Sequence, residues 1–338
     1  MQTEPLEDFA SRQMMRLSNG TLVSQAISVA ASLGVADQLA SGPRPVDEIA
    51  AAVGADAPTL YRLLRALADV ELFQELDGRC FALTELSELL RTGVPGSMRN
   101  WAIMMGMQPW HGMCAGLLDA VRTGEPAFER IFEQPPFEYL RDHPDSARVF
   151  DAAMTDNSAA LSAAVVGVYD FGSFRTVVDV GGGNGALLAA VLAANPGLRG
   201  VLFDMPEVVP GTRRVLADAG VADRCNVVAG DFFDSVPSGG DAYLLSHVIH
   251  DWDDERSVQI LTNCRAAMAD GGRVVLAEDV LSDKIEPSMA KWTDLHMLLI
   301  GGRQRTESEF AALFRRAGLE PSRVVPAGVC GLVEAIPA

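Results

Sequence analysis

The stretch Thr176–Ala194, TVVDVGGGNGALLAAVLAA, joins two structural elements through a glycine-rich turn. Its first five residues are rich in β-branched side chains, as in a buried strand, and its last nine have the composition of an apolar helix. Gly181, Gly183 and Gly185 lie between the two, where bare backbone can turn sharply and approach a ligand closely. The stretch therefore predicts a strand, a ligand-binding loop and a helix.

The same alternation continues to the end of the chain. The runs RGVLFDM, CNVVAGD, DAYLLSHVI and GRVVLAEDVL read as buried strands, and amphipathic helices separate them. Alternation of this kind builds a parallel sheet covered by helices on both faces. A last helix, ESEFAALFRRAG, and a closing hairpin complete the pattern. We expect an α/β fold, with a Rossmann-like catalytic domain over residues 169–338.

The N-terminal third follows a different pattern. Residues from about 18 to 95 contain short amphipathic helices, and FQELDGRCFAL places a DG turn between two short apolar flanks, which indicates a hairpin. Helices followed by a small wing predict a winged-helix-like domain over residues 1–95. Residues 96–168 are again helical, with prolines at the breaks, and read as a helical linker.

Composition narrows the class of partner. The net charge of -18 arises from 45 acidic and 27 basic residues, so the surface repels nucleic-acid phosphates and anionic membranes. The helix that would enter a DNA groove offers only Arg62 and Arg65, amid acidic residues. The five cysteines show no CxxC pairing, and the first residues lack the features of a secretion signal. We expect a cytoplasmic protein with a small-molecule partner, no nucleic acid and no membrane.

The glycine loop and the strand ends predict the cofactor. The loop reads GxGxG after Asp179, whereas the dinucleotide fingerprint reads GxGxxG and receives a pyrophosphate. S-adenosylmethionine has no phosphate, and its ammonium and sulfonium suit an acidic residue and loop carbonyls. Asp204, at the next strand end, can accept both ribose hydroxyls, with Met205 covering the adenine. Asp231 and Phe232 follow the third strand and suit the adenine amino group and ring. A dinucleotide oxidoreductase is disfavoured.

A histidine follows the fourth strand. His250 comes after DAYLLSHVI, at the edge of the sheet where ligands bind, and is a candidate general base for a phenol, whose pKa is about 10. His247 lies at an odd offset, so in an extended strand it faces the opposite side, and we interpret it as structural. A metal site built from His250, Asp251, Asp253 and Asp254 is an alternative. Acidic residues before a helix are also typical N-cap and first-turn residues, and we predict no metal.

The motifs VDVGGGNG, LFDMPEVV, GDFF, HDWDDE and DLHMLLIGGRQRTESEF together resemble one known family. These are the caffeate-type small-molecule O-methyltransferases of plants and their bacterial relatives that tailor antibiotics and pigments. The resemblance implies a homodimer formed by swapping the N-terminal unit, a substrate pocket between the domains, and metal-independent transfer with His250 as base.

The resemblance also assigns individual residues. In the family two glutamates flank the histidine. Glu278 matches the first, whereas Gln304 replaces the second and can hydrogen-bond the ring without stabilising an imidazolium by charge. Met and Trp at helical spacing also occur in ordinary hydrophobic cores. The Met and Trp residues that the resemblance assigns to the substrate pocket could therefore be core residues instead. Further cofactor contacts are implied at Gly181, Gly183, the backbone near Ser246 and Ser158, and a substrate lining at Met104, Met107, Trp110, Met154, Asp251, Trp252 and Met297.

Two other functions use the same motifs. A relative could bind the same cofactor and transfer the methyl group to nitrogen, or catalyse another reaction. A winged-helix regulator could sense S-adenosylmethionine, although the acidic charge and the HDW motif disfavour it. The retained His250 favours transfer to oxygen.

Overall fold

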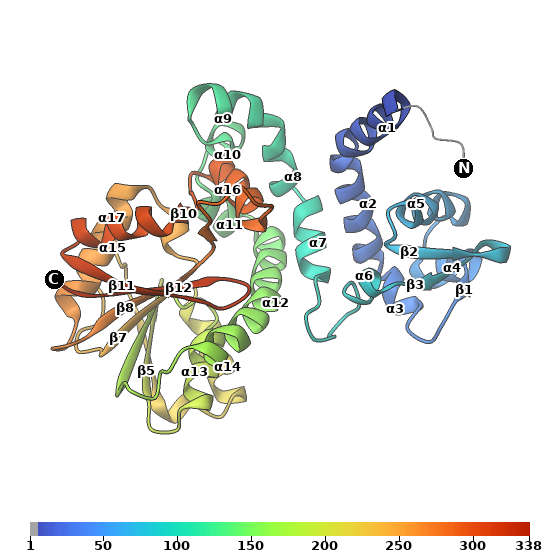
Figure 1. The fold of residues 1–338 in the computed structure, drawn as a ribbon. Coiled ribbons are helices and arrows are strands. Elements are labelled where there is room, and N and C mark those ends of the chain that lie inside the picture. The colour runs from blue at the N-terminus through green and yellow to red at the C-terminus, as the bar shows by residue number, and fades with distance from the viewer. Residues whose placement is uncertain (1–5) are drawn as a thin grey trace. The chain divides into compact units, whose positions relative to one another are not determined.

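The computed structural model describes residues 6–338, which form two compact units (Figure 1). The first unit comprises the chain up to Gly112 together with Phe137–Asn157, and the second comprises Met113–Pro136 and Ser158–Ala338. The long helix α12 (Pro144–Val168) contributes to both. The stretch 96–168, predicted as a separate linker, is thus shared between the two units.

The first unit contains the predicted helices and hairpin. Its helices include α2 (Gly20–Leu33), α3 (Val35–Gln38), α4 (Val46–Val53) and α5 (Ala57–Asp69), and β1 (Arg44–Pro45), β2 (Phe73–Leu76) and β3 (Cys80–Leu83) form a sheet in the order β1-β3-β2. Asp56 caps α5 by accepting from the Thr59 amide at 3.0 Å. The helices α1 (Leu6–Ser18), α6 (Glu85–Glu88) and α7 (Arg99–Gly106) complete this part of the unit.

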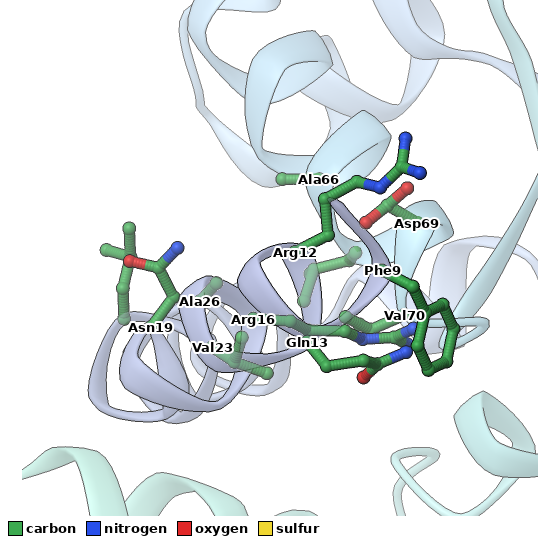
Figure 2. A pocket seen from close by; sticks show the side chains of 12 residues that line it. Phe9, Arg12, Gln13, Arg16, Asn19, Val23, Ala26, Ala66, Asp69 and Val70 are labelled. Atoms are coloured by element: carbon green, nitrogen blue, oxygen red, sulfur yellow. The ribbon is translucent and has the colours of Figure 1, made fainter. Parts of the chain in front are cut away.

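The surface of this unit has an apolar hollow formed by α1, α2 and α5. The cavity has a volume of about 610 Å³, and Figure 2 shows side chains from all three helices around it. Phe9 and Leu22, on its rim, are 55% and 68% exposed. Apolar surface exposed around a hollow in this way often marks a contact surface.

The second unit is built on a seven-stranded sheet with the order β11-β12-β8-β7-β4-β5-β6. The strands from β4 to β8 run parallel, and the closing hairpin adds two antiparallel strands. The predicted sheet and hairpin are confirmed. The strands are β4 (Thr176–Val180), β5 (Arg199–Asp204), β6 (Cys225–Ala229), β7 (Ala242–Ser246), β8 (Arg273–Glu278), β11 (Leu319–Pro326) and β12 (Gly331–Pro337).

Helices cover both faces of this sheet. One apolar cluster joins the end of α12 with α13 (Ala186–Ala194) and α14 (Val209–Asp218), and a second joins α15 (Asp254–Ala267) with α17 (Glu307–Arg316). The chain leaves β4 toward β5 on one side, whereas β7 lies on the other. Ligands bind at such a reversal, beyond the carboxyl ends of the strands.

The remaining α-helices and strands of the chain are short. They are α8 (Trp110–Met113), α9 (Leu117–Thr123), α10 (Ala127–Phe132), α11 (Pro136–Asp142), α16 (Met289–Ile300), β9 (Val280–Leu281) and β10 (Arg305–Thr306). The sequence did not predict that β9 and β10 pair in parallel. This pairing places the segment before β10 next to the end of β8. Among residues 6–338, no helix combines the length and apolar character needed to cross a bilayer.

Candidate active site

The glycine loop after β4 is packed against the segment that follows β7. Gly181 has φ +70°, and a Cβ atom there would lie 2.8 Å from a methyl group of Val248, so only glycine fits. Gly183 has φ +57°, and a Cβ there would face open space. The Gly183 amide donates to Asp204 at 2.7 Å, and its carbonyl accepts from Thr212 at 2.9 Å. The loop is therefore fixed by the neighbouring strand end and helix.

Two carboxyl groups lie beneath this loop. Asp179 is 1% exposed, and neither of its oxygens has a hydrogen-bond partner. Burial, with the nearby Asp204 charge, raises its pKa to about 7. The Asp204 carboxylate accepts from the amides of Gly183 and Met205, both at 2.7 Å, and burial raises its pKa despite these bonds. A buried acidic group without a partner suits a cationic ligand.

The third strand end adds an aromatic ring and another carboxylate. Asp231 accepts from the Phe233 amide at 2.8 Å, and the carbonyl of Phe232 accepts from Asn263 at 2.8 Å. The Phe232 ring lies 3.7 Å from the position of a Cβ on Gly181. The residues predicted at the ends of β4, β5 and β6 thus contact the glycine loop or lie at the same edge of the sheet. Met205, which is half-exposed, lies at this edge as well.

These residues fit a sulfonium nucleoside. The carboxylate of Asp204 retains acceptor capacity for hydroxyl groups, and Asp179 offers the unpartnered acidic oxygens. A pyrophosphate would meet two carboxyl groups here. Ser246 ends β7 and is partly buried. Ser158, on α12, accepts from the Ser162 hydroxyl through its carbonyl, and its contact with the cofactor stays a prediction.

His250 lies in a 3-10 turn, η4 (Ile249–Asp251), directly after this edge. Glu278 supports the turn, because its Oε1 accepts from the amides of Val248 at 3.1 Å and Ile249 at 2.8 Å. The Nδ1 atom of His250 lies 2.9 Å from Nε2 of Gln304 and 3.5 Å from Oε2 of Glu278. The structure therefore brings the three predicted catalytic residues together.

The site around His250 is mostly desolvated. The ring is 13% exposed, and burial followed by the charge of His247 lowers its pKa to about 3. Burial also raises the pKa of Glu278 to about 7 and that of Asp251 to about 8. The Nε2 atom of His250 lies 3.5 Å from Oδ1 of Asp251. His250 is therefore neutral at pH 7, as a proton acceptor must be.

The interpretation of His247 as facing the opposite side was wrong. The strand β7 ends at Ser246, and His247 has φ +51°, outside the extended conformation that produces alternation. Its ring stacks on that of His250, with centroids 5.2 Å apart. Its Nε2 lies 3.8 Å from Oδ1 of Asp279. The two histidines share one site.

Arg305 is a supporting residue that sequence reasoning missed. It is fully buried and donates to the carbonyls of Ile249 at 3.0 Å and Trp252 at 2.8 Å, and it bonds Asp254. It therefore fixes the backbone on both sides of His250. Arg305 directly follows Gln304, and this position could have indicated a role beside the candidate active site. An arginine between predicted elements is usually exposed, however, so the sequence favoured a surface position.

The acidic residues after His250 have structural partners. Asp253 is the N-cap of α15 and accepts from the Arg256 amide at 2.8 Å, as the N-cap interpretation predicted. Asp254 bonds Arg305. No group of three or more His, Cys, Asp or Glu residues within the described chain has the arrangement of a metal site.

The residues predicted to line the substrate pocket fall in both units. Met104, Met107, Trp110 and Met154 belong to the first, and Asp251, Trp252 and Met297 to the second. Met297 packs beside the His250 backbone, since a Cβ on Gly302 would meet both. Trp252 packs edge-on against Phe233 at 4.7 Å. Their contact with a substrate stays a prediction.

This site and sheet define a class of enzyme, the S-adenosylmethionine-dependent methyltransferases. Comparison with known proteins gives the family. Residues 114–320 match the model of the O-methyltransferase domain, and residues 15–93 match that of the O-methyltransferase dimerisation domain. The chain belongs to this O-methyltransferase family.

Curated relatives include transferases to oxygen and to nitrogen. A phenazine O-methyltransferase of Lysobacter antibioticus is 46% identical over 96% of this chain and 95% of its own. A phenazine-1-carboxylate N-methyltransferase of Pseudomonas aeruginosa is 37% identical, over 94% of each chain.

Solved structures agree with this placement. A mitomycin 7-O-methyltransferase has a TM-score of 0.91 and 38% identity, covering 98% of this chain and 99% of that chain. An O-methyltransferase from neocarzinostatin biosynthesis, solved with S-adenosylmethionine and 2-hydroxy-5-methyl naphthoic acid, has a TM-score of 0.79 and 35% identity, covering 93% and 96%.

Proposed function

We propose that this enzyme transfers a methyl group to a hydroxyl group of a small aromatic secondary metabolite, with His250 as the general base and without a metal ion. The observation that carries the proposal is the position of His250. Val248, two residues before His250, packs against Gly181, so a neutral, oriented imidazole lies close to the glycine loop that we propose as the cofactor site.

Different residues of the chain would contact different parts of the cofactor. Asp204, Asp231 and Phe232 would hold the nucleoside, and Asp179 with the carbonyls of the glycine loop would face its cationic groups. When bound, S-adenosylmethionine supplies an electrophilic methyl group on a sulfonium. A neutral phenol is a poor nucleophile, so the residues around His250 must accept its proton as the oxygen attacks.

The orientation of the Gln304 amide decides which ring nitrogen of His250 is basic. With the amide nitrogen toward Nδ1, Gln304 donates, and its Oε1 is buried without a donor. The two ends of an amide are nearly equal in size. When the amide turns by 180°, Oε1 accepts the Nδ1 proton, and the lone pair of Nε2 is then available to the acceptor hydroxyl. We assign this second arrangement to the reacting enzyme.

Transfer to an aromatic nitrogen is the second candidate function. A ring nitrogen without a proton needs no base, and the low pKa of His250 together with the neutral Gln304 leaves the site with weak basicity. A curated relative that methylates nitrogen shows that the family includes this reaction. The two candidates differ in how strongly they depend on His250.

We also propose that the enzyme works as a homodimer in the cytoplasm, joined through the first unit by exchange of its helices. The match to a dimerisation domain and the exposed apolar hollow of α1 and α2 support the dimer. The five cysteines, all free, are consistent with a reducing compartment. We keep Met104, Met107, Trp110 and Met154 of the first unit as proposed substrate contacts.

A panel of acceptors tests the proposed function. Hydroxylated phenazines, hydroxynaphthoic acids and simple phenols would be incubated with the enzyme and methyl-labelled S-adenosylmethionine, each beside its O-methylated counterpart as a blocked control. We expect labelled product from at least one free hydroxyl compound and none from its blocked counterpart. Product formed equally from a blocked aza-aromatic would establish nitrogen transfer instead.

A further inference from the structure

His247 occupies an unusual position beside the proposed base. Its φ of +51° is one that residues with a side chain rarely adopt, and such conformations persist where the surrounding structure imposes them. Its backbone amide donates to the carbonyl of Ala277 on β8 at 3.0 Å, which fixes the turn. The result is a stack of two imidazole rings, 5.2 Å apart between centroids and inclined by 24°.

The two stacked rings have different surroundings. His250 is 13% exposed and faces the neutral amide of Gln304, whereas His247 is 37% exposed and faces the carboxylate of Asp279. The Oδ1 atom of Asp279 lies 3.8 Å from Nε2 of His247, and the pKa of Asp279 is lowered because the interaction with His247 outweighs burial. His250 also lies 3.5 Å from the carboxyl groups of Glu278 and Asp251, but burial raises the pKa of both of these groups, whereas the pKa of Asp279 beside His247 is lowered. The carboxylate that most readily keeps its charge therefore faces His247.

We propose that His247 is a positioning residue for proton transfer: paired with Asp279, it carries a positive charge against the ring of His250 and so keeps His250 unprotonated until the acceptor binds. The inference rests on the proposed role of His250. It adds a residue pair, His247 and Asp279, to a site otherwise described by His250, Glu278 and Gln304.

The charges around the pair agree with this assignment. Burial alone would lower the pKa of His247, but the Asp279 carboxylate, 3.8 Å from its Nε2 atom, together with the nearby acidic groups Glu278 and Asp251, raises it above the ordinary value of a histidine. For His250, burial and the charge of His247 lower the pKa, and Arg305 lowers it further, against the opposing effects of Asp279 and Gln304. A cation on one ring and a neutral second ring is the arrangement that these groups favour.

The pair also indicates which acceptors suit the site. A base held neutral by an adjacent cation is a weak base, so it removes a proton most readily from an acidic hydroxyl. Aromatic hydroxyls made acidic by a carbonyl group, a ring nitrogen or a nitro group should therefore be better acceptors than unsubstituted phenol.

Titration of the histidines by NMR tests the charge on His247 directly. The whole protein, without cofactor or acceptor, would be labelled at the ring carbon Cε1 of its five histidines, and the signals of His247 and His250 assigned by their loss on substitution. The test pair is His247→Gln and His247→Lys, which impose the same backbone strain and differ in charge. Because no methyl transfer is measured, the result is independent of whether the proposed function is correct.

We expect His250 to stay neutral down to pH 5 in the wild type and in His247→Lys. In His247→Gln its midpoint should rise by about two pH units, the effect of a unit charge about 5 Å away at an effective dielectric constant of ~20. A merely structural role would affect both variants alike. An unchanged His250 midpoint in His247→Gln would overturn the proposal.

Asp279→Asn provides a second test if the His247 variants do not fold. Removal of the partner carboxylate should lower the midpoint of His247 by at least one pH unit. A wild-type His247 that titrates below pH 6.5, or that is insensitive to Asp279→Asn, would contradict the proposal. In activity assays, His247→Gln should reduce the preference for a nitrophenol over its unsubstituted counterpart, whereas His247→Lys should retain it.

Discussion

Asp204→Ala is the sharpest test of the cofactor site. The carboxylate of Asp204 ends β5 and accepts from the amides of Gly183 and Met205, both at 2.7 Å. A carboxylate offers about four acceptor positions, so two remain for the ribose hydroxyls. The substitution removes those positions and also frees the amide that holds the glycine loop.

The expected loss of affinity follows from these bonds. Hydrogen bonds to a charged group contribute about 1.5 to 3 kcal/mol. The amides of Gly183 and Met205, which lose their acceptor in the variant, add to this loss of binding free energy only where water does not hydrate them. Binding of S-adenosylhomocysteine should therefore weaken by about 10- to 150-fold. Isothermal titration calorimetry at constant pH measures this loss.

Two variants serve as controls for Asp204→Ala. Asp218→Ala removes an exposed carboxylate of α14, which pairs with Arg214 at 3.6 Å, and should leave the affinity unchanged. Asp204→Asn keeps one acceptor oxygen and should fall between the wild type and Asp204→Ala. A loss smaller than threefold in Asp204→Ala would refute the assignment of this carboxylate to the ribose.

Three further predictions concern charge and assembly. Gln304→Glu places a carboxylate against Nδ1 of His250, and this charge should raise the pKa of the ring, which is about 3, by roughly one to three pH units. The acid limb of the kcat/KM profile should therefore move to higher pH, and an unmoved limb would contradict this geometry. The pKa of Asp179 is about 7, so affinity for cationic S-adenosylmethionine should rise from pH 5.5 to 7 as the carboxylate forms, and calorimetry should show no such rise in Asp179→Asn. Leu22→Glu should convert the dimer to a monomer in light scattering, whereas the exposed control Leu118→Glu should not; a wild-type monomer at micromolar concentration would exclude the dimer.

Much of the catalytic unit could be predicted because parallel strands align their carboxyl ends. Once TVVDVGGGNG is read as a strand and loop, Asp204, Asp231 and His250 must follow at the same edge. The hairpin of the first unit was equally predictable from its DG turn, where Gly78 has φ +71°.

The local geometry of His247 could not be predicted from alternation. Alternation holds only within the strand, and the turn at φ +51° after Ser246 rotates the next side chain toward His250. The role of Arg305 was equally hidden, because it depends on the pairing of β9 with β10 across 25 residues of chain, from Val280 to Arg305. Such pairing is set by tertiary packing rather than by local sequence.

The measurement that tests the central claim most directly is methyl transfer by His250→Ala, compared with the wild type on a phenolic acceptor identified in the panel. We predict a turnover lower by about 10² to 10⁴, as for other lost acid-base groups, with an unchanged Kd for S-adenosylhomocysteine, since the nucleoside contacts lie on other strand ends. Near-full activity of His250→Ala at neutral pH would show that proximity and orientation alone carry the reaction, and that His250 is not the base.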